Sequence, residues 1–356
     1  MRILHASNFG GRHNGRLFWN HSFKISNGLI RNGHSVYNFC DRESSRSNFL
    51  NKFTNNSYVQ KSFIETANNF KPDLIILGHA DRINVETLDN IRFKNSALKI
   101  IEWNVDNYHL DNTEEKLKNR SKYLDALFIT TADEKISTCL NNNKISFFPN
   151  IVDSSIEKFK IFNNSFFEKD VFFALSHGVG TGILRKKNSN YENNDPRVQL
   201  LNFLIKGSKN NVNYSFFGLN GHQPIWASDF EVEINKSYSG LIVQREPQLK
   251  YCLSDRISQY AGNGLMVHIN KNTHYDEILK DRTEAVFYND EEQLLSNILY
   301  YKDNLNEARS IAENCHNKMH LYFNERVVTQ YFLDCLGNNN NKQLSTNYNW
   351  PIHLYN

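Results

Sequence analysis

The sequence predicts an α/β protein of two domains, each built on a parallel sheet. Short apolar runs alternate with helical patterns along the first half of the chain, which is typical of parallel strands joined by crossover helices. The alternation stops in a polar segment and then restarts with a new apolar run. The chain has 356 residues, 40% of them hydrophobic and 13% aromatic, which is enough for two domains with separate cores.

Turn signals and composition indicate the domain boundaries. The turn Pro149-Asn-Ile-Val-Asp153 closes the first domain, which we expect at residues 1–153. Residues 154–168 are polar with scattered aromatic side chains and are the expected linker. We expect the second domain at residues 169–336. Residues 337–356 begin with an asparagine-rich run that lacks periodicity, so we expect a flexible tail there.

In the first domain, strands and helices are expected to alternate. The expected strands are Arg2–Ala6, Ser35–Phe39, Asp73–Leu77, Leu98–Trp103, Ala126–Thr130 and Ile145–Phe148. The expected helices are Arg16–Arg31, Tyr58–Phe70, Val85–Arg92, Asn112–Lys122 and Ala132–Leu140.

The second domain repeats this alternation and ends in helices. The expected strands are Val171–Leu175, Tyr214–Phe217, Gly240–Val243, Leu265–Ile269 and Ala285–Tyr288. The expected helices are Pro196–Lys206, Ile225–Lys236, a short helix that begins near Ser254, and the C-terminal helices Glu291–Asn304, Asn306–Phe323 and Glu325–Leu336.

Charge and cysteine content exclude several classes of protein. The formal net charge is only +3 and no basic stripe accompanies it, so nucleic acid is not an expected partner. The five cysteines form no Cys-x-x-Cys pair and are expected to be reduced thiols. The N-terminus enters a strand at once, and no apolar run approaches the ~20 residues of a membrane helix. We therefore expect a soluble, cytoplasmic protein, and peripheral association with the inner face of a membrane stays open.

The segment from Lys250 to Asn324 carries the most specific signal. A polar turn with Lys250 and Ser254 leads into a helix that begins near Arg256 and stops at glycines before a buried strand. Helix N-termini at the carboxyl ends of parallel strands offer N–H groups to phosphate. Arg256 would hold a phosphate through two hydrogen bonds and Lys250 would add a point charge. The alternative is a surface ion pair of Arg256 with Asp255 or Glu246.

Several motifs of this segment together resemble a known enzyme family. They are Ser254-Asp-Arg256, Gly262-Asn-Gly264-Leu-Met-Val, Asn289-Asp-Glu-Glu292, Arg309-Ser-Ile-Ala312 and His320-Leu-Tyr-Phe-Asn324-Glu-Arg326. Over about residues 172–336 the chain resembles the C-terminal half of GT-B glycosyltransferases, and most closely the CgeB/YkvP-like, family-1-type group. The resemblance implies two Rossmann-like domains that face each other across a cleft, with C-terminal helices. It also implies donor binding in the second domain and acceptor binding in the first.

One residue departs from the pattern of that family. Gln259 stands where many members carry a glutamate that binds the ribose hydroxyls of the donor. An amide both donates and accepts hydrogen bonds, so Gln259 could still bind a ribose. The other interpretations are a different donor or a degenerate site.

A glycine-rich loop follows the first strand of the second domain. Its glycines, among them Gly178 and Gly180, would let the backbone approach an anion, and His177 and Arg185 are its expected polar contacts. The alternative is an ordinary glycine-rich turn followed by a solvated basic run.

Two further loops with glycines are expected to face the donor. Gly10 and Gly11 follow the first strand of the first domain, where they would let the donor approach, although a plain surface turn is the alternative. Gly218 follows the strand Tyr214–Phe217, and the resemblance places its loop near the nucleobase.

A general base for the acceptor hydroxyl is expected on the first domain. An inverting transferase needs such a base within hydrogen-bond reach of the hydroxyl, whereas a retaining enzyme does not. Asp106 is the first candidate because it follows a buried strand, and His79 and His13 are the next. Each of these side chains has a structural role as its alternative.

The absence of other motifs narrows the chemistry. The sequence contains no His-Glu-x-x-His run, no Gly-x-Ser-x-Gly elbow and no Asp-x-Asp motif, so neither a metal site nor a cofactor is expected. The leading hypothesis is a metal-independent glycosyltransferase that moves a sugar from a nucleotide-sugar to a glycan or lipid-linked acceptor in cell-envelope or surface polysaccharide synthesis. The alternatives are a nucleotide-sugar 2-epimerase or phosphorylase of the same fold, and a catalytically silent binding or coat protein.

Overall fold

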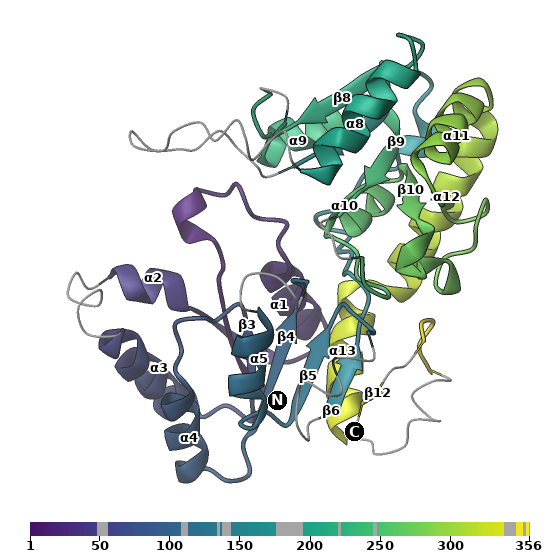
Figure 1. The fold of residues 1–356 in the computed structure, drawn as a ribbon. Helices are drawn as coiled ribbons and strands as arrows, with labels where there is room; N and C mark the ends of the chain where they lie inside the picture. The colour runs from purple at the N-terminus through teal and green to yellow at the C-terminus, as the bar shows by residue number, and fades with distance from the viewer. Residues whose placement is uncertain are drawn as a thin grey trace. The chain divides into compact units, whose positions relative to one another are not determined.

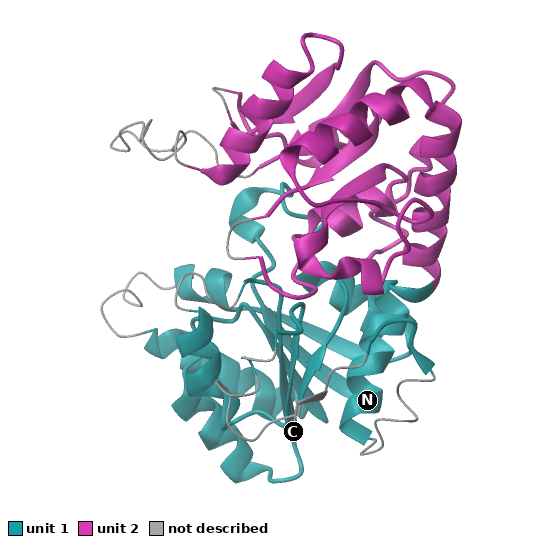
Figure 2. Ribbon diagram, turned by 45° about the vertical axis from the view of Figure 1, so that its right-hand side comes forward, with its two compact units in different colours: residues 1–151, 322–356 teal, residues 152–321 magenta. Residues whose placement is uncertain are grey.

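Contacts divide the chain into two compact units. The computed structural model describes residues 1–47, 56–107, 113–133, 136, 144–175, 195–219, 222–244, 248–337, 347–351 and 354–355. Unit 1 consists of Met1–Ile151 together with Tyr322–Asn356, and unit 2 consists of Val152–Leu321. Figure 2 colours the two units separately.

Unit 1 is built on a sheet whose order is β12-β6-β5-β4-β3-β1-β2. Its strands are β1 (Arg2–Ser7), β2 (Ser35–Cys40), β3 (Leu74–Gly78), β4 (Lys99–Asn104), β5 (Ala126–Ile129), β6 (Lys144–Phe147) and β12 (Leu354–Tyr355). All neighbouring strands are parallel except β12, which runs antiparallel to β6. Every residue of β3 is buried, as expected for a central strand that is covered on both faces.

The helices of unit 1 largely follow the expected pattern. They are α1 (His21–Arg31), α2 (Asp41–Arg46), α3 (Ser57–Phe70), α4 (Val85–Lys94), α5 (Thr113–Ser121) and α13 (Glu325–Gly337). The expected start of the first helix at Arg16 is wrong, because the side chain of Asn20 accepts from the Phe23 N–H and caps a helix that begins at His21. The expected helix Ala132–Leu140 lies almost wholly outside the described residues.

The expected end of the second domain at residue 336 differs from the structure, in which unit 2 ends at Leu321. The sequence places the helix that begins at Glu325 in the second domain, but α13 packs on α1 in unit 1. A Cβ atom at Gly28 would overlap the backbone of Glu325, so the two helices approach closely, and Arg31 forms an ion pair of 2.6 Å with Glu325. The sequence signal for this helix was correct, but its partner is far away in sequence.

Part of the expected flexible tail is also packed against unit 1. Trp350 is buried and its ring contacts the rings of Phe323 and Tyr331. β12 pairs with β6 through Leu354 and Tyr355, and it lies beside β6 in Figure 1. The backbone of β12 therefore completes the sheet, and Trp350 packs against Tyr331 of α13.

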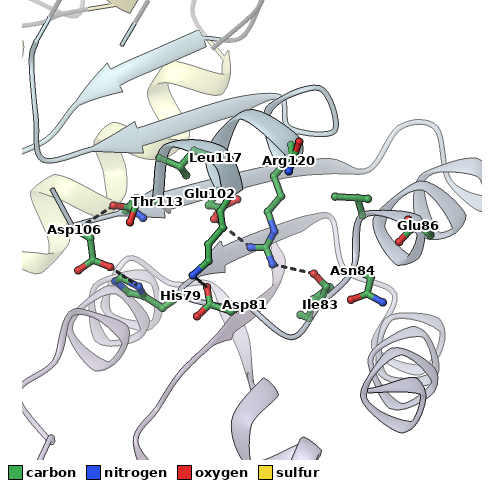
Figure 3. Close-up of a pocket in the computed structure, with 14 residues that line it drawn as sticks. His79, Asp81, Ile83, Asn84, Glu86, Glu102, Asp106, Thr113, Leu117 and Arg120 are labelled. Carbon is green, nitrogen blue, oxygen red and sulfur yellow. Dashed lines mark hydrogen bonds and ion pairs between the residues drawn. The ribbon is translucent and has the colours of Figure 1, made fainter. Parts of the chain in front are cut away.

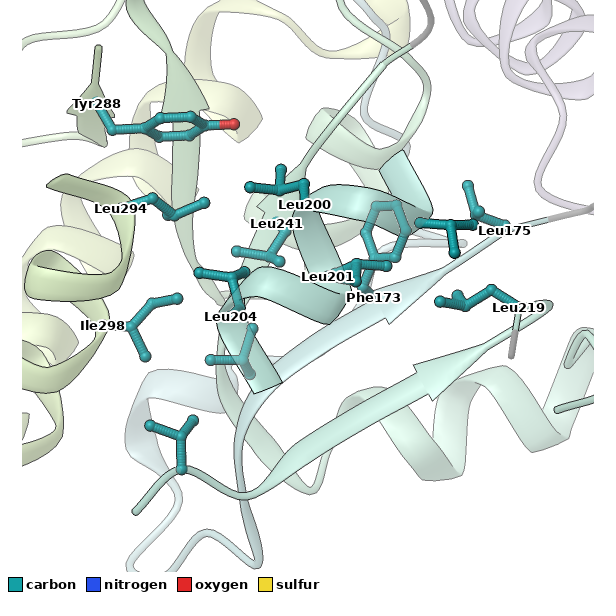
Figure 4. Close-up of a cluster of buried hydrophobic side chains, with 13 residues drawn as sticks. Phe173, Leu175, Leu200, Leu201, Leu204, Leu219, Leu241, Tyr288, Leu294 and Ile298 are labelled. Carbon is teal, nitrogen blue, oxygen red and sulfur yellow. The ribbon is translucent and has the colours of Figure 1, made fainter. Parts of the chain in front are cut away.

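Unit 2 has a fully parallel sheet in the order β11-β10-β9-β7-β8. Its strands are β7 (Lys169–Ala174), β8 (Tyr214–Phe217), β9 (Ser237–Ile242), β10 (Met266–Asn270) and β11 (Val286–Tyr288). Its α-helices are α8 (Pro196–Gly207), α9 (Ala227–Ile234), α10 (Arg256–Gly262), α11 (Glu291–Asp303) and α12 (Leu305–Tyr322). Figure 4 shows the core between the sheet and α8 and α11, where Phe173, Leu201, Leu241, Leu294 and Ile298 meet.

Candidate functional site

The carboxyl edge of the sheet in unit 1 carries a pocket of about 440 Å³ (Figure 3). β3 and β4 are neighbouring parallel strands, so the residues that follow them emerge side by side. His79 follows β3, Asp106 follows β4 after a single intervening residue, and both line the pocket. Helix α5 supplies part of the wall through Lys116 and Arg120. Two of the three candidate catalytic residues are thus brought together.

The backbone holds His79 in a conformation that few residues adopt. Its φ angle is 51°, in the left-handed region, which costs free energy for a residue other than glycine and is common at functional sites. A Cβ atom at the preceding Gly78 would overlap the ring of Trp103, so only glycine fits there. The Trp103 ring in turn meets the His79 ring edge to face, with centroids 5.2 Å apart.

A hydrogen-bond chain fixes this tryptophan in the core. The Trp103 indole N–H donates to Nε2 of His5 over 3.1 Å, and Nδ1 of His5 lies 2.8 Å from the hydroxyl of Ser26. Burial lowers the pKa of His5 to about 3, so this ring is neutral and Nε2 can accept. These hydrogen bonds hold the Trp103 ring that His79 contacts.

His79 and Asp106 form a pair. Nδ1 of His79 lies 3.4 Å from Oδ2 of Asp106. The side chain of the buried Asn104 accepts a hydrogen bond of 2.8 Å from the Asp106 backbone N–H, which fixes the turn after β4. The Asp106 side chain remains 58% exposed, so the pair is open to a ligand.

A buried ion pair forms another part of the pocket wall. Arg120 Nη1 lies 3.2 Å from Glu102 Oε1, and Arg120 Nη2 donates to the carbonyl oxygens of Ala80 and Ile83. The other oxygen of Glu102, Oε2, is buried and has no hydrogen-bond partner in the described part of the chain. Burial raises the pKa of Glu102 although Arg120 acts in the opposite direction.

Sequence reasoning did not select Glu102 or Arg120 as candidates. The available signal was Glu102 inside the otherwise apolar run Ile100–Trp103, because a buried strand seldom carries an ionisable group without a partner. Arg120 carried no such signal, because its place on α5 resembles that of any charged residue on a solvated helix.

The third catalytic candidate, His13, lies elsewhere. It is not among the residues that line the pocket, and its Nε2 accepts a hydrogen bond of 2.8 Å from Arg12. Desolvation, followed by the charge of Arg12, lowers its pKa. Gly10 has a φ of 67° and precedes a short 3₁₀ turn (Gly11–His13) that packs against Glu43, so the local structure itself requires a glycine at position 10.

In unit 2, Arg256 binds protein groups at the corresponding edge of the sheet. Its Nε donates to the carbonyl oxygen of Ala174, and its Nη1 donates to that of Val243, both over 2.9 Å. The same Nη1 donates to the hydroxyl of Ser254, and the guanidinium lies over the ring of Phe173. Of the two alternative ion-pair partners, Glu246 lies outside the described residues. The guanidinium joins the ends of β7 and β9.

Lys250 and Gln259 differ in their surroundings. Lys250 Nζ lies 3.2 Å from Glu277 Oε2, and a hydrogen bond from Tyr251 is the largest cause of a lowered pKa at that glutamate. Gln259 is 8% exposed, and within the described residues its side-chain amide makes no hydrogen bond. The amide is therefore available to a ligand, whereas the lysine first has to leave a carboxylate.

The donor candidate Gly218 directly follows β8. Gly218 has a φ of 78°, and a Cβ atom there would overlap the backbone of Leu175, so its neighbours in the fold explain the glycine. The candidates His177, Gly178, Gly180 and Arg185 lie outside the described residues.

The described residues show neither a metal-binding cluster nor a membrane-spanning helix. In that part of the chain, no group of three or more His, Cys, Asp or Glu side chains is arranged to hold a metal ion. Within the same residues, no helix combines the length and apolar character needed to cross a membrane.

A family model matches part of the second half of the chain. Residues 193–334 match the model of the family described as "Glycosyl transferase-like". The matched segment covers unit 2 from α8 onward and extends into α13. No curated protein sequence matches the chain.

Solved structures match the fold over nearly the whole chain. Sucrose-phosphate synthase from Thermosynechococcus elongatus has a TM-score of 0.59 at 10% identity and covers 97% of this chain and 99% of its own. Anabaena HepE in complex with UDP and glucose has a TM-score of 0.53 at 13% identity, covering 95% and 99%. A putative UDP-N-acetylglucosamine 2-epimerase from Listeria monocytogenes has a TM-score of 0.51 at 10% identity, covering 94% and 95%. The protein thus has the α/β fold of GT-B glycosyltransferases, with two Rossmann-like units.

Proposed function

We propose that this protein is a glycosyltransferase that uses a nucleotide-sugar donor. The observation that carries the proposal is the His79–Asp106 pair, with 3.4 Å between Nδ1 and Oδ2, in a pocket at the carboxyl edge of a parallel sheet. Open α/β sheets bind their ligands at this edge. The glycosyl transferase-like match at residues 193–334 and the UDP-bound fold relative support the choice of donor.

The pair supplies a general base for an acceptor hydroxyl. Asp106 faces Nδ1 and favours the tautomer that keeps the proton on that nitrogen, which leaves Nε2 of His79 to accept a proton. In the proposed step, the acceptor O–H proton moves to Nε2 as the oxygen attacks the anomeric carbon. The bond from that carbon to the diphosphate breaks, and the nucleoside diphosphate leaves with the electron pair. A single displacement of this kind inverts the configuration of the sugar.

Unit 2 would bind the nucleotide. Gln259 supplies an amide that is available for ribose hydroxyls, and Lys250 supplies a charge for the diphosphate once it leaves Glu277. Arg256 would act mainly by holding the ends of β7 and β9, because its guanidinium already donates to Ala174 and Val243. A glycan or lipid-linked acceptor, a role in surface polysaccharide synthesis, a cytoplasmic location and the CgeB/YkvP-like subgroup remain predictions.

Calorimetry with UDP-, GDP-, CMP- and dTDP-sugars on the full chain tests the donor. We expect one nucleotide class to bind, and Gln259→Ala to weaken its binding. Release of the free nucleotide and the anomeric configuration of the product then test the reaction. A protein that binds none of these donors would contradict the proposal and favour a silent binding protein.

A 2-epimerase is the second candidate, because the fold also resembles the Listeria protein. The two reactions differ in their need for an acceptor. An epimerase converts its nucleotide-sugar in the absence of any acceptor, whereas a transferase releases the nucleotide at an appreciable rate only when an acceptor is present. Incubation of the donor alone, followed by NMR of the sugar, distinguishes the two.

A further inference from the structure

We propose that the pocket in unit 1 binds an acceptor that carries a protonated amino group, such as an amino sugar, and that Glu102 receives this group. The inference rests on the proposed function only in calling the ligand an acceptor. The binding of an amine in the pocket does not depend on that function. It is drawn from the charges that line the pocket and from one buried oxygen atom.

The lining of the pocket has an excess of negative charge. Asp81, Glu86, Glu102 and Asp106 contribute four carboxylates, against two cations from Lys116 and Arg120. The two cations also face carboxylates of the pocket. Arg120 contacts Glu102 and two carbonyl oxygens, and Lys116 lies 4.0 Å from Asp81. Arg42, outside the lining, also pairs with Asp81 over 2.5 Å. Four carboxylates against three cations still leave a net negative wall for an anionic ligand.

Glu102 has an oxygen atom that lacks a partner. The residue is 4% exposed, and its Oε2 accepts no hydrogen bond within the part of the chain that the structure describes. A buried carboxylate oxygen without a donor costs free energy, and a ligand that supplies a donor would remove this cost. Figure 3 shows Glu102 beside Arg120 in the wall of the pocket.

The charge of Arg120 alone does not offset the cost of burying the Glu102 carboxylate. Burial raises the pKa of Glu102 in spite of the nearby Arg120, so the negative charge is under-compensated in the free protein. An ammonium group bound at Oε2 would supply both the missing donor and the missing charge. A neutral hydroxyl would supply only the donor. The geometry therefore favours an amine over a plain hydroxyl, and both over a phosphate or carboxylate.

Direct binding to the full chain, without donor, tests this preference. The probes are glucosamine, glucose, N-acetylglucosamine and glucose 6-phosphate, titrated by calorimetry or ligand-observed NMR at near-neutral pH. We expect glucosamine to bind roughly tenfold more tightly than glucose, as a hydrogen bond to a charged group predicts. N-acetylglucosamine should resemble glucose, and glucose 6-phosphate should bind most weakly. Equal affinity for glucosamine and glucose, or tightest binding of the phosphate, would overturn the proposal.

Variants locate the effect in the pocket. Glu102→Gln keeps the shape and an oxygen for Arg120 but removes the charge, and it should abolish the preference for glucosamine. Glu115→Gln, on the exposed side of α5 and outside the pocket, is the matched control and should keep it. Thermal melting checks the fold of both proteins. Should Glu102→Gln unfold, Glu86→Gln changes an exposed carboxylate of the pocket and should reduce the preference about twofold. An unchanged preference in every folded pocket variant would contradict the proposal.

The donor experiment separates this inference from the proposed function. Donor binding without a glucosamine preference would leave a transferase with a different acceptor. A glucosamine preference without binding of any donor would leave an amine-binding pocket in a protein that is not a transferase.

Discussion

Charged side chains lie at the carboxyl edges of both sheets, but their contacts differ between the two units. In unit 1, His79 and Asp106 follow neighbouring strands, pair with each other and line an open pocket. In unit 2, Arg256 lies at the ends of β7 and β9 and donates to their carbonyl oxygens. A charged residue at a strand end can therefore be exposed to a ligand, or it can bond to the carbonyl oxygens of neighbouring strands and hold them together. Its hydrogen-bond partners, rather than its position, distinguish the two roles.

Replacing His79 should have the largest effect if the edge of unit 1 performs catalysis. His79→Asn keeps a residue that tolerates positive φ but removes the base, and we expect the rate of transfer to fall about 10²- to 10⁴-fold. The measurement is the initial rate of nucleotide release with the identified donor and saturating acceptor. His34→Asn, at the amino edge of the same sheet, is the control. A rate within twofold of the control would remove His79 from the mechanism.

Replacing Arg256 should affect stability as well as activity. Arg256→Ala removes two hydrogen bonds that link strand ends, and we expect unit 2 to lose about 2 kcal/mol of unfolding free energy. Urea-dependent hydrogen exchange in β7 and β9 measures this loss for the unit itself. The matched control is Arg309→Ala, because Arg309 also donates to a backbone carbonyl, that of Asn164, and lies over the ring of Phe167. A fully stable but inactive Arg256→Ala protein would restore Arg256 as a phosphate ligand.

Two buried histidines extend the comparison to pH. Burial lowers the pKa of both His5 in unit 1 and His268 in unit 2 from 6.5 to about 3. Each stays neutral in the folded protein but takes up a proton on unfolding below pH 6.5. Their contribution to stability is therefore complete above that pH and is lost as the pH falls toward 3, by up to about 1.4 kcal/mol per pH unit for each ring.

The partners of these two rings predict opposite mutational effects. His5 is bonded to Trp103, whereas neither ring nitrogen of His268 has a partner among the described residues. His268→Leu should be neutral or stabilising near pH 7, and its advantage over the parent should grow to about 2 kcal/mol near pH 5. His5→Leu should destabilise at pH 7, because it leaves the Trp103 N–H unpaired. Urea unfolding at several pH values measures both. A destabilised His268→Leu protein at both pH values would show that its ring has a partner.

Releasing Lys250 should have the smallest effect. Glu277→Gln removes the carboxylate that holds Lys250, so the affinity for the nucleoside diphosphate should rise about two- to threefold, as expected for an exposed pair. Glu313→Gln, an exposed residue on α12, changes the net charge equally and serves as the control. If calorimetry finds the same affinity in both variants, Lys250 does not contact the diphosphate.

Most of the fold could be predicted because its signals are local. The strand Tyr214–Phe217 was predicted with the bounds it has in the structure, and the other expected strands are displaced by at most a few residues. The packing of α13 on unit 1 could not be predicted, because nothing in a helical pattern identifies a partner almost 300 residues away. Trp350 is buried against Tyr331 of that helix, a contact that the asparagine-rich sequence before it does not indicate.

The candidate site was predictable only in part. Asp106 and His79 were selected because polar residues after buried strands gather at one sheet edge, and the structure places them 3.4 Å apart. Their proposed roles remain predictions. The contacts of Arg256 were not foreseen, since carbonyl oxygens at strand ends carry no sequence signature. For the same reason Glu102 was overlooked, because its unpartnered oxygen becomes visible only in three dimensions.

The return of the chain from unit 2 to unit 1 has a consequence for folding during synthesis. Unit 2 is one continuous stretch, so it can fold as soon as residue 321 has left the ribosome. Unit 1 cannot be completed at that stage, because the face of α1 at Gly28 stays uncovered until α13 is made, and β6 lacks its neighbour β12 until residue 355 is made. The unit synthesised first is thus the last to be completed. The face of α1 that α13 later covers is therefore exposed while residues 152–321 are translated. A chaperone could bind that face during this time.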